Sequence, residues 1–304
     1  MSGEFFYWIF NMSIISSLVG LVVLLVRSIR KIPRRIAIFL WLAPFLRMCI
    51  PVGLNHPYSL MSLISGFTTK TITVYQPVQG ISFSATNAIM AADSYFPITF
   101  KVNLLDRVFE IASIIWLVAA LAIGLALGIL YLTTLHDMKG AKHLRDNVYL
   151  SDRIQGPAVY GIIKPKILLP AAFDPRDYPY ILKHERTHVR RLDNLWRLAA
   201  CLITAVHWFN PLCWLFLKRF LEDMELACDE AAIADYSKAQ RKEYALSLVN
   251  CAESKSLFAS GFGGAKLRTR VETIVSYEKM TCFSALCFSI LTVSMLVVLL
   301  TNAG

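Results

Sequence analysis

The chain has 304 residues, of which 56% are apolar and 17% are charged, and its mean hydropathy is +0.52. These values exclude an ordinary soluble globule, a disordered chain and a fibre. The formal charge of +10 is typical both of nucleic-acid-binding proteins and of membrane proteins with a basic cytoplasmic side. Seven cysteines in so long a chain do not indicate a small disulfide-linked fold.

Four apolar stretches are each long enough to cross a hydrocarbon core, which takes roughly 20 helical residues. Three of them contain no charged residue, whereas the second contains Arg47. We expect this arginine to reach a nearby membrane interface rather than to pair within the bundle. The sequence therefore predicts a mainly α integral membrane protein with four transmembrane helices, at 5–26, 36–54, 111–135 and 281–301.

The orientation of these spans follows from the segment RSIRKIPRR between the first two, which carries five basic residues and no acid. Short basic loops lie on the cytoplasmic side of a membrane. We therefore expect a multi-pass plasma-membrane protein with its N- and C-termini outside. Its parts would be a three-span region at 1–135 with an outer loop at 55–107, a cytoplasmic domain at 136–279 and a fourth span at 280–304.

The cytoplasmic domain is expected to be α+β. Short β-branched and aromatic runs with Gly and Pro between them predict two or three strands within 148–169. Helical patterns follow, including one that begins at Asn210-Pro211 as N-cap and first residue, and two amphipathic ones at about 238–254 and 265–279. The charges are well mixed along the domain, so direct contact with nucleic acid is not expected.

The sharpest motif is His184-Glu185-Arg186-Thr187-His188, which lies within a helical pattern. Positions i and i+4 share one face of a helix, so both imidazoles can reach one Zn²⁺ while Glu185 lies beside the metal. Zinc makes a water more acidic, and a neighbouring carboxylate can take its proton. The motif predicts a zinc hydrolase site with Glu185 as general base.

A catalytic zinc needs a third protein ligand and an open fourth position. The next helical segment offers five acids: Glu222, Asp223, Glu225, Asp229 and Glu230. Because Glu225 and Asp229 are four residues apart, one can bind the metal while the other accepts the free N–H of a ligand histidine. The alternative is a solvated acidic face at the end of an amphipathic helix.

The mostly apolar stretch at 198–217 resembles a fifth span. A crossing there would place His184 and Glu225 on opposite sides of the membrane, where they could not share a metal. We therefore expect a membrane-associated helical hairpin at 195–217 that turns at the sequence FNP, with the zinc site at its base.

Three further side chains have two interpretations each. Asp193 could orient a ligand histidine or be an exposed carboxylate at a helix end. His207 is expected to be a polar residue at the hairpin tip, with a transition-state role as the alternative. Cys228 is expected to be a small buried residue rather than a soft zinc ligand.

Four blocks of the sequence resemble the BlaR/MecR-type integral-membrane zinc peptidases, the antibiotic-sensing signal transducers and their relatives. In chain order they are KPKILLP, HERTHVRRLDNLWR, HWFNPLCW and EDMELACDEAAI. The resemblance implies one zinc per chain and a gluzincin-like peptidase domain between spans three and four. It also implies roles for five residues, namely His184, His188 and Glu225 as ligands, Glu185 as general base and Asp229 as the carboxylate that orients a ligand.

In the antibiotic sensors the last span leads into a large extracellular penicillin-binding domain, whereas this sequence ends three residues after Thr301. Covalent sensing of β-lactams is therefore not predicted. Either the chain is a family member without the sensor domain or the sequence is truncated, and these two cases stay open.

Three functional hypotheses follow. The first is a membrane-embedded zinc endopeptidase in transmembrane signalling, which cleaves a cytoplasmic protein, by family implication a winged-helix repressor. The second is an HtpX-like quality-control protease. The third is a non-catalytic signalling scaffold in which zinc is structural and Cys228 completes a closed site. The bilayer is a partner in all three, and a homodimer is left open.

Overall fold

The computed structural model describes residues 2–29, 32–50, 55–56, 58–62, 104–154, 156–171, 174–253 and 267–303. Most of the expected outer loop at 55–107 and the Gly-rich linker before the last cytoplasmic helix lie outside these residues. The elements in chain order are α1 (Ser2–Arg27), α2 (Arg34–Ala37), the 3₁₀-helix η1 (Ile38–Trp41), α3 (Leu42–Cys49), β1 (Asn55–His56), α6 (Leu104–Asp137), β2 (Lys142–Arg145), β3 (Val148–Ser151), β4 (Ala158–Tyr160), β5 (Lys166–Pro170), α7 (Tyr178–Arg191), α8 (Asp193–Val206), α9 (Pro211–Ala232), α10 (Lys238–Glu253), α11 (Leu267–Val275), α12 (Cys282–Leu300) and β6 (Asn302–Ala303).

Three helices within the described residues are long and apolar enough to cross a membrane. Their apolar spans are Phe5–Arg27 in α1, Arg107–Thr133 in α6 and Cys282–Leu300 in α12. They coincide with the first, third and fourth predicted spans. The prediction of a mainly helical protein is thus confirmed, with three of the four predicted spans matched by helices long and apolar enough to cross a membrane.

The second predicted span, 36–54, is an interrupted helix rather than one long one. It consists of α2, η1 and α3, which together cover residues 34–49, about 24 Å at 1.5 Å per residue. Ile50 is extended, with φ −119° and ψ 110°, because a residue that precedes a proline, here Pro51, is disfavoured in the α region. The helix therefore ends at Cys49, short of the roughly 30 Å of a hydrocarbon core.

Arg47 pairs within the bundle, which was the alternative to the expected position at an interface. Its side chain is buried, at 4% exposure, and it donates hydrogen bonds to the carbonyls of Leu299 at 3.2 Å and Thr301 at 2.6 Å. Carbonyls at the C-terminus of a helix have no partner inside the helix, so a buried guanidinium can satisfy them. Arg47 thus ties the end of α3 to the end of α12.

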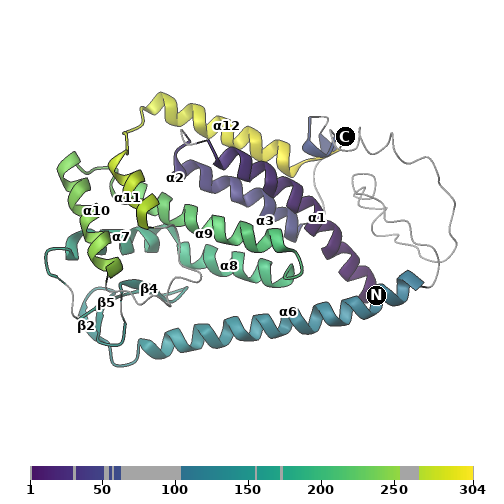
Figure 1. Cartoon of the computed structure of the whole chain (residues 1–304), viewed down its shortest axis with the longest axis horizontal. Helices are drawn as coiled ribbons and strands as arrows, with labels where there is room; N and C mark the ends of the chain where they lie inside the picture. Colours follow the sequence, from purple (N-terminus) through teal and green to yellow (C-terminus); the bar gives the residue numbers. More distant parts are fainter. Residues whose placement is uncertain are drawn as a thin grey trace.

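The main apolar core lies between α1, α3, α9 and α12, which run side by side in Figure 1. Gly20 of α1 lies against the ring of Phe216 of α9, where a Cβ atom would overlap the ring. Phe216 and Trp41 are both fully buried in this core. A small residue at position 20 therefore lets α1 and α9 approach closely.

A small sheet lies at the end of the molecule opposite the start of α1 (Figure 1). Its strand order is β2-β3-β5-β4, with β3 parallel to β5 and the other two pairings antiparallel. The prediction of strands within 148–169 is confirmed, and β2 is an additional strand. Val148, Ile167 and Leu169 pack with Ile181 and Leu182 of α7, which fixes α7 against the sheet.

Helices α8 and α9 lie side by side and are joined by a short turn (Figure 1). Asn210 caps α9 by accepting a hydrogen bond from the N–H of Leu212 at 2.9 Å, and Pro211 is the first helical residue. Because α9 runs back along α8, its C-terminal half returns to the end at which α7 lies. Glu225 therefore lies at the same end as His184.

The basic segment between α1 and α2 is attached to α9. Arg27 bonds to Asp223 at 2.8 Å and to Glu222 at 3.1 Å. The backbone N–H groups of Arg34 and Arg35 donate to the carboxylate of Glu230 at 3.1 and 3.0 Å. The cytoplasmic end predicted for the bundle is thus bonded to the helix that carries Glu225.

Candidate metal centre

Two helices bring four of the expected residues together. His184 and His188 lie one turn apart on α7, and Glu225 and Asp229 lie one turn apart on α9. α7 ends at Arg191, and the next residue, Leu192, is left-handed at φ 57°. This turn of the backbone allows Asp193, the first residue of α8, to lie back against α7.

Three side-chain atoms of this group point toward one another. The Nε2 atoms of His184 and His188 are 3.1 Å apart, and Oε2 of Glu225 is 3.7 Å from each of them. Atoms bound to one tetrahedral zinc at about 2.1 Å are roughly 3.4 Å from each other. Both histidines are buried, at 5% and 7% exposure. The donor set and its spacing fit a zinc ion.

The other nitrogen of His184 is held by two groups. Its Nδ1 is 2.8 Å from the hydroxyl of Tyr244 on α10 and 3.2 Å from Oδ1 of Asp229. Tyr244 donates to the same Oδ1 at 2.7 Å, and both burial and the Asp229 charge raise the pKa of Tyr244 well above its usual value, so the phenol keeps its proton. A proton on Nδ1 leaves the lone pair on Nε2 free for a metal.

His188 is oriented in the same way by a different carboxylate. Its Nδ1 lies 2.6 Å from Oδ2 of Asp193, and Asp193 is 2% exposed. The other oxygen, Oδ1, accepts from Nε of Arg191 at 3.3 Å. Of the two interpretations of Asp193, the geometry favours the one in which it orients a histidine, and it is not an exposed helix-end acid.

Two arginines flank the carboxylate of Glu225. Arg197 lies 3.4 Å from Oε1 and Arg270 lies 3.5 Å from Oε2. Burial would raise the pKa of Glu225, but His188, His184 and Arg270 hold it well below its usual value. The group is therefore an anion that can bind a cation.

Glu185 is buried, at 6% exposure. Within the described part of the chain no hydrogen bond or ion pair holds its carboxylate. A buried carboxylate without a protein partner, one residue after His184, is available to exchange protons with a water or a substrate.

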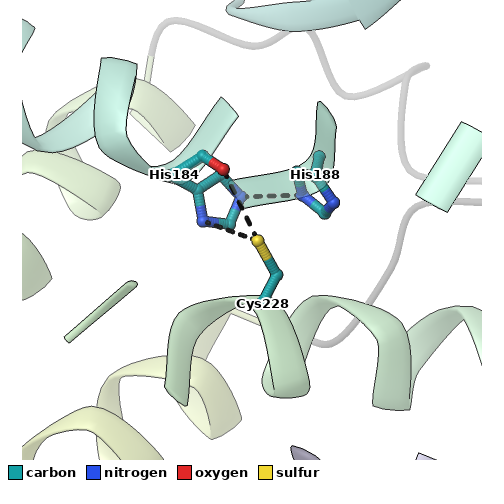
Figure 2. A group of neighbouring side chains, drawn as sticks. All are labelled: His184, His188 and Cys228. Atoms are coloured by element: carbon teal, nitrogen blue, oxygen red, sulfur yellow. Dashed lines mark hydrogen bonds between the residues drawn. The ribbon is translucent and has the colours of Figure 1, made fainter. Parts of the chain in front are cut away.

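Cys228 is the other donor near the histidines. A cation could meet His184, His188 and Cys228 together, since one donor atom of each lies within 4.8 Å of the others. Figure 2 shows the thiol on the side of Nδ1 and the backbone oxygen of His184, at 3.7 and 3.5 Å. The thiol thus lies against Nδ1, the nitrogen of His184 that also contacts Tyr244 and Asp229. Nε2 is the nitrogen of His184 that faces Glu225.

The remaining expected residues lie elsewhere. His207 follows the last residue of α8, and the 14 residues of that helix separate it from the histidine pair by about 20 Å. Its Nδ1 bonds to the carbonyl of Ile203 at 3.1 Å, so the structure does not bring it to the site. Of the five acids on α9, Glu222, Asp223 and Glu230 face the basic segment instead.

Three residues near the site were not predicted from the sequence: Arg197, Tyr244 and Arg270. Arg197 lies on α8, Tyr244 on α10 and Arg270 on α11, and none has a fixed spacing to the motif. In the sequence each of them looks like an ordinary polar residue of an amphipathic helix, so no motif pointed to the site.

An HExxH helix crossed by a helix that carries a further carboxylate defines a candidate metallopeptidase site, here at one end of a bundle that includes helices long and apolar enough to cross a membrane. The family model described as BlaR1 peptidase M56 matches residues 7–274, and the chain belongs to this family.

Curated relatives agree with this assignment. Regulatory protein BlaR1 of Bacillus licheniformis is 30% identical over 159 residues, which are 48% of this chain and 26% of that protein. Methicillin resistance mecR1 protein of Staphylococcus aureus is 25% identical over 151 residues, which are 46% of this chain and 25% of that protein. Regulatory protein BlaR1 of Staphylococcus aureus is 22% identical over 192 residues, 53% of this chain and 32% of that protein. The matches thus span a third or less of the relatives' own length.

Proposed function

We propose that this protein is a membrane-embedded zinc-dependent endopeptidase that acts in transmembrane signalling by cleaving a cytoplasmic protein. The observation that carries the proposal is the convergence of His184 Nε2, His188 Nε2 and Glu225 Oε2 at 3.1 to 3.7 Å. Beside them lies the buried carboxylate of Glu185, which has no hydrogen-bond or ion-pair partner among the described residues. Membership of the BlaR1 peptidase M56 family supports peptide hydrolysis as the reaction.

In this proposal His184, His188 and Glu225 hold one zinc ion per chain, while Asp229, Tyr244 and Asp193 orient the two imidazoles. When bound, zinc would polarise a peptide carbonyl and make a water more acidic. Glu185 takes the proton of the attacking water and passes it to the departing amine. His207 has no part in this chemistry, because it lies about 20 Å away along α8.

The proposed topology is multi-pass, with both termini outside and the metal centre in the cytoplasm. Arg27 and Arg34 support it, because both contact Asp223, two residues before Glu225. The basic segment and the metal centre therefore lie at the same end of the bundle, and the positive-inside rule assigns that end to the cytoplasm. The second predicted span, 36–54, of which α2, η1 and α3 form the helical part, is proposed as the remaining crossing, beside α1.

The substrate is proposed to be a protein, with a winged-helix repressor as the specific candidate. It would bind in extended form along β4, which pairs only with β5 among the described strands and is therefore an edge. β5 is an interior strand and cannot serve this purpose. Asn194, the second residue of α8, donates to the carbonyls of Val159 and Gly161 at 2.9 and 3.0 Å, which attaches this strand to the start of α8.

The test compares the full chain with its Glu185→Gln variant in nanodiscs. Zinc content is measured by elemental analysis, and cleavage of purified winged-helix repressors is followed by mass spectrometry. We expect one zinc per chain in both proteins and cleavage only by the wild type. Glu243→Gln, at an exposed position on α10, is the matched control and should cleave normally.

Other outcomes would select other functions. Cleavage of many unfolded membrane proteins, without preference for a repressor, would favour quality control. Zinc bound equally in both proteins, no cleavage by either, and loss of zinc in Cys228→Ser would indicate a closed structural site that includes the thiol.

A further inference from the structure

Arg270 reaches into the metal centre from α11, a helix that supplies none of the proposed ligands. Its Nε and Nη2 atoms bond to Oδ2 and Oδ1 of Asp229 at 2.7 and 2.8 Å. The same guanidinium has Nη1 at 3.5 Å from Oε2 of Glu225 and Nη2 at 3.3 Å from Nε2 of His184. Its side chain is 15% exposed, so its positive charge is largely shielded from water.

Two roles are physically open to a cation at this place. Arginine stays protonated at any physiological pH, so it could compete with a metal ion for Glu225 and His184. Alternatively it could hold the carboxylate that orients His184. The two roles predict opposite effects of its removal, because loss of a competitor strengthens metal binding and loss of a support weakens it.

The contacts favour the second role. Asp229 is fully buried, at 0% exposure, and a buried carboxylate without a compensating charge is strongly disfavoured. Arg270 provides that charge through two parallel hydrogen bonds, the geometry in which a guanidinium matches a carboxylate best. Its contacts to Glu225 and His184, at 3.5 and 3.3 Å, are longer than either bond to Asp229.

We propose that Arg270 is a positioning residue of the metal centre, which holds Asp229 against Tyr244 and Nδ1 of His184 and thereby presents Nε2 of His184 to the zinc. The inference rests on the proposed zinc site and extends it to α11. Because Cys282, the first residue of α12, follows the end of α11 by seven positions, the helix that completes the site is the one joined to the last membrane span.

The test measures affinity for Zn²⁺ and Co²⁺ by competition with a chromophoric chelator, on the full chain in detergent. Arg270→Gln should lower both affinities about 10- to 100-fold, the usual effect of losing a group that orients a ligand. It should also change the visible absorption of the Co²⁺ form, which a loss of stability alone would not. Arg270→Lys should recover only part of the affinity, because an ammonium cannot make both bonds. Arg268→Gln, on the same helix with a side chain 89% exposed, is the matched control and should bind like the wild type.

A double variant tests whether Arg270 affects zinc affinity through Asp229. If Arg270 acts through Asp229, the double variant Arg270→Gln/Asp229→Asn should bind zinc within about a factor of two of Asp229→Asn alone. Tighter metal binding by Arg270→Gln, binding equal to that of the Arg268 control, or fully additive losses would each overturn the proposal. Should Arg270→Gln fail to fold, full retention of affinity by Arg270→Lys overturns it instead. A wild type that binds no zinc refutes the proposed function itself, whereas tight binding by both wild type and Arg270→Gln refutes only the role of Arg270.

Discussion

The carboxylate of Asp193 lies 2.6 Å from Nδ1 of His188, so the first residue of α8 orients the second histidine of α7. The contact depends on Leu192, whose left-handed backbone, at φ 57°, turns the chain between the two helices. A residue five positions after the motif in sequence thus lies against it in space.

Removal of this contact should weaken metal binding. Asp193→Ala is expected to lower zinc affinity about 10- to 100-fold, because the His188 ring loses the acceptor that fixes its tautomer. Asp193→Asn should lose less, since the amide oxygen still accepts from Nδ1–H. Zinc titration of the purified protein measures both. Asp152→Asn, at an exposed position, is the control, and an Asp193→Ala variant that binds like it would contradict the role.

Tyr244 should contribute to the same property through His184. Tyr244→Phe removes the hydroxyl that lies 2.8 Å from Nδ1 of His184 and 2.7 Å from Asp229. We expect zinc affinity to fall about 10-fold, the lower end of the range for such groups, because Asp229 still lies 3.2 Å from Nδ1. The control is Tyr236→Phe, whose ring contacts that of Tyr244. Equal affinities of the two variants would show that the hydroxyl has no such function.

The ion pair between Arg27 and Asp223 should stabilise the attachment of the basic segment to α9. The Asp223 side chain is 1% exposed and also accepts from Nε1 of Trp41 at 2.9 Å. Asp223→Ala leaves Nε1 of Trp41 without this acceptor and Arg27 with only its bond to Glu222. Since Arg27 is partly exposed, we expect a loss of about 2 kcal/mol. The readout is the thermal unfolding temperature in nanodiscs at a fixed scan rate.

The exposed pair of Arg268 and Glu272 provides the control for that measurement. Its side chains are 89% and 62% exposed, so Glu272→Ala should leave the unfolding temperature unchanged. If both variants unfold at the wild-type temperature, the buried pair does not stabilise the protein.

The contact between Gly20 and Phe216 predicts opposite effects for two glycine substitutions. Gly20→Ala would overlap the ring of Phe216 and should destabilise the bundle by about 1–3 kcal/mol. Gly124 of α6 has no atom within 4 Å of a Cβ at that position, so Gly124→Ala should be neutral or stabilising by up to about 1 kcal/mol. Thermal unfolding of the two variants decides the matter, and an equal response would refute the close approach of α1 and α9.

The sequence could predict which residues of the site lie close together where their spacing within one helix determines this. His184 and His188 share a face of α7 because they are four residues apart, and the apolar stretch 198–217 required a turn for Glu225 to join them. The structure brings these atoms together, while their role as ligands remains a prediction. Tyr244 and Arg270 could not be predicted, because tertiary packing of α10 and α11 alone brings them to α9.

The predicted membrane spans likewise show that local sequence patterns predict helices but not their tertiary contacts. Hydropathy predicted α1, α6 and α12 closely, since a long uncharged run can satisfy its backbone only as a helix. It did not predict that the helical part of 36–54 ends at Cys49, which depends on the local effect of Pro51 on Ile50. Nor did it predict that Arg47 would bond to the end of α12, because its partners there are carbonyls distant in sequence.

Helix α9 is part of both the apolar core of the bundle and the candidate metal centre. Its first half packs Phe216 and Phe220 into the apolar core of the bundle, and its second half carries Glu225 and Asp229 without a break in the helix. Residues 136–279 alone would expose that apolar surface to water, so they would aggregate rather than form a soluble enzyme. For the same reason a ligand that binds at the metal centre should raise the unfolding temperature of the membrane bundle as well.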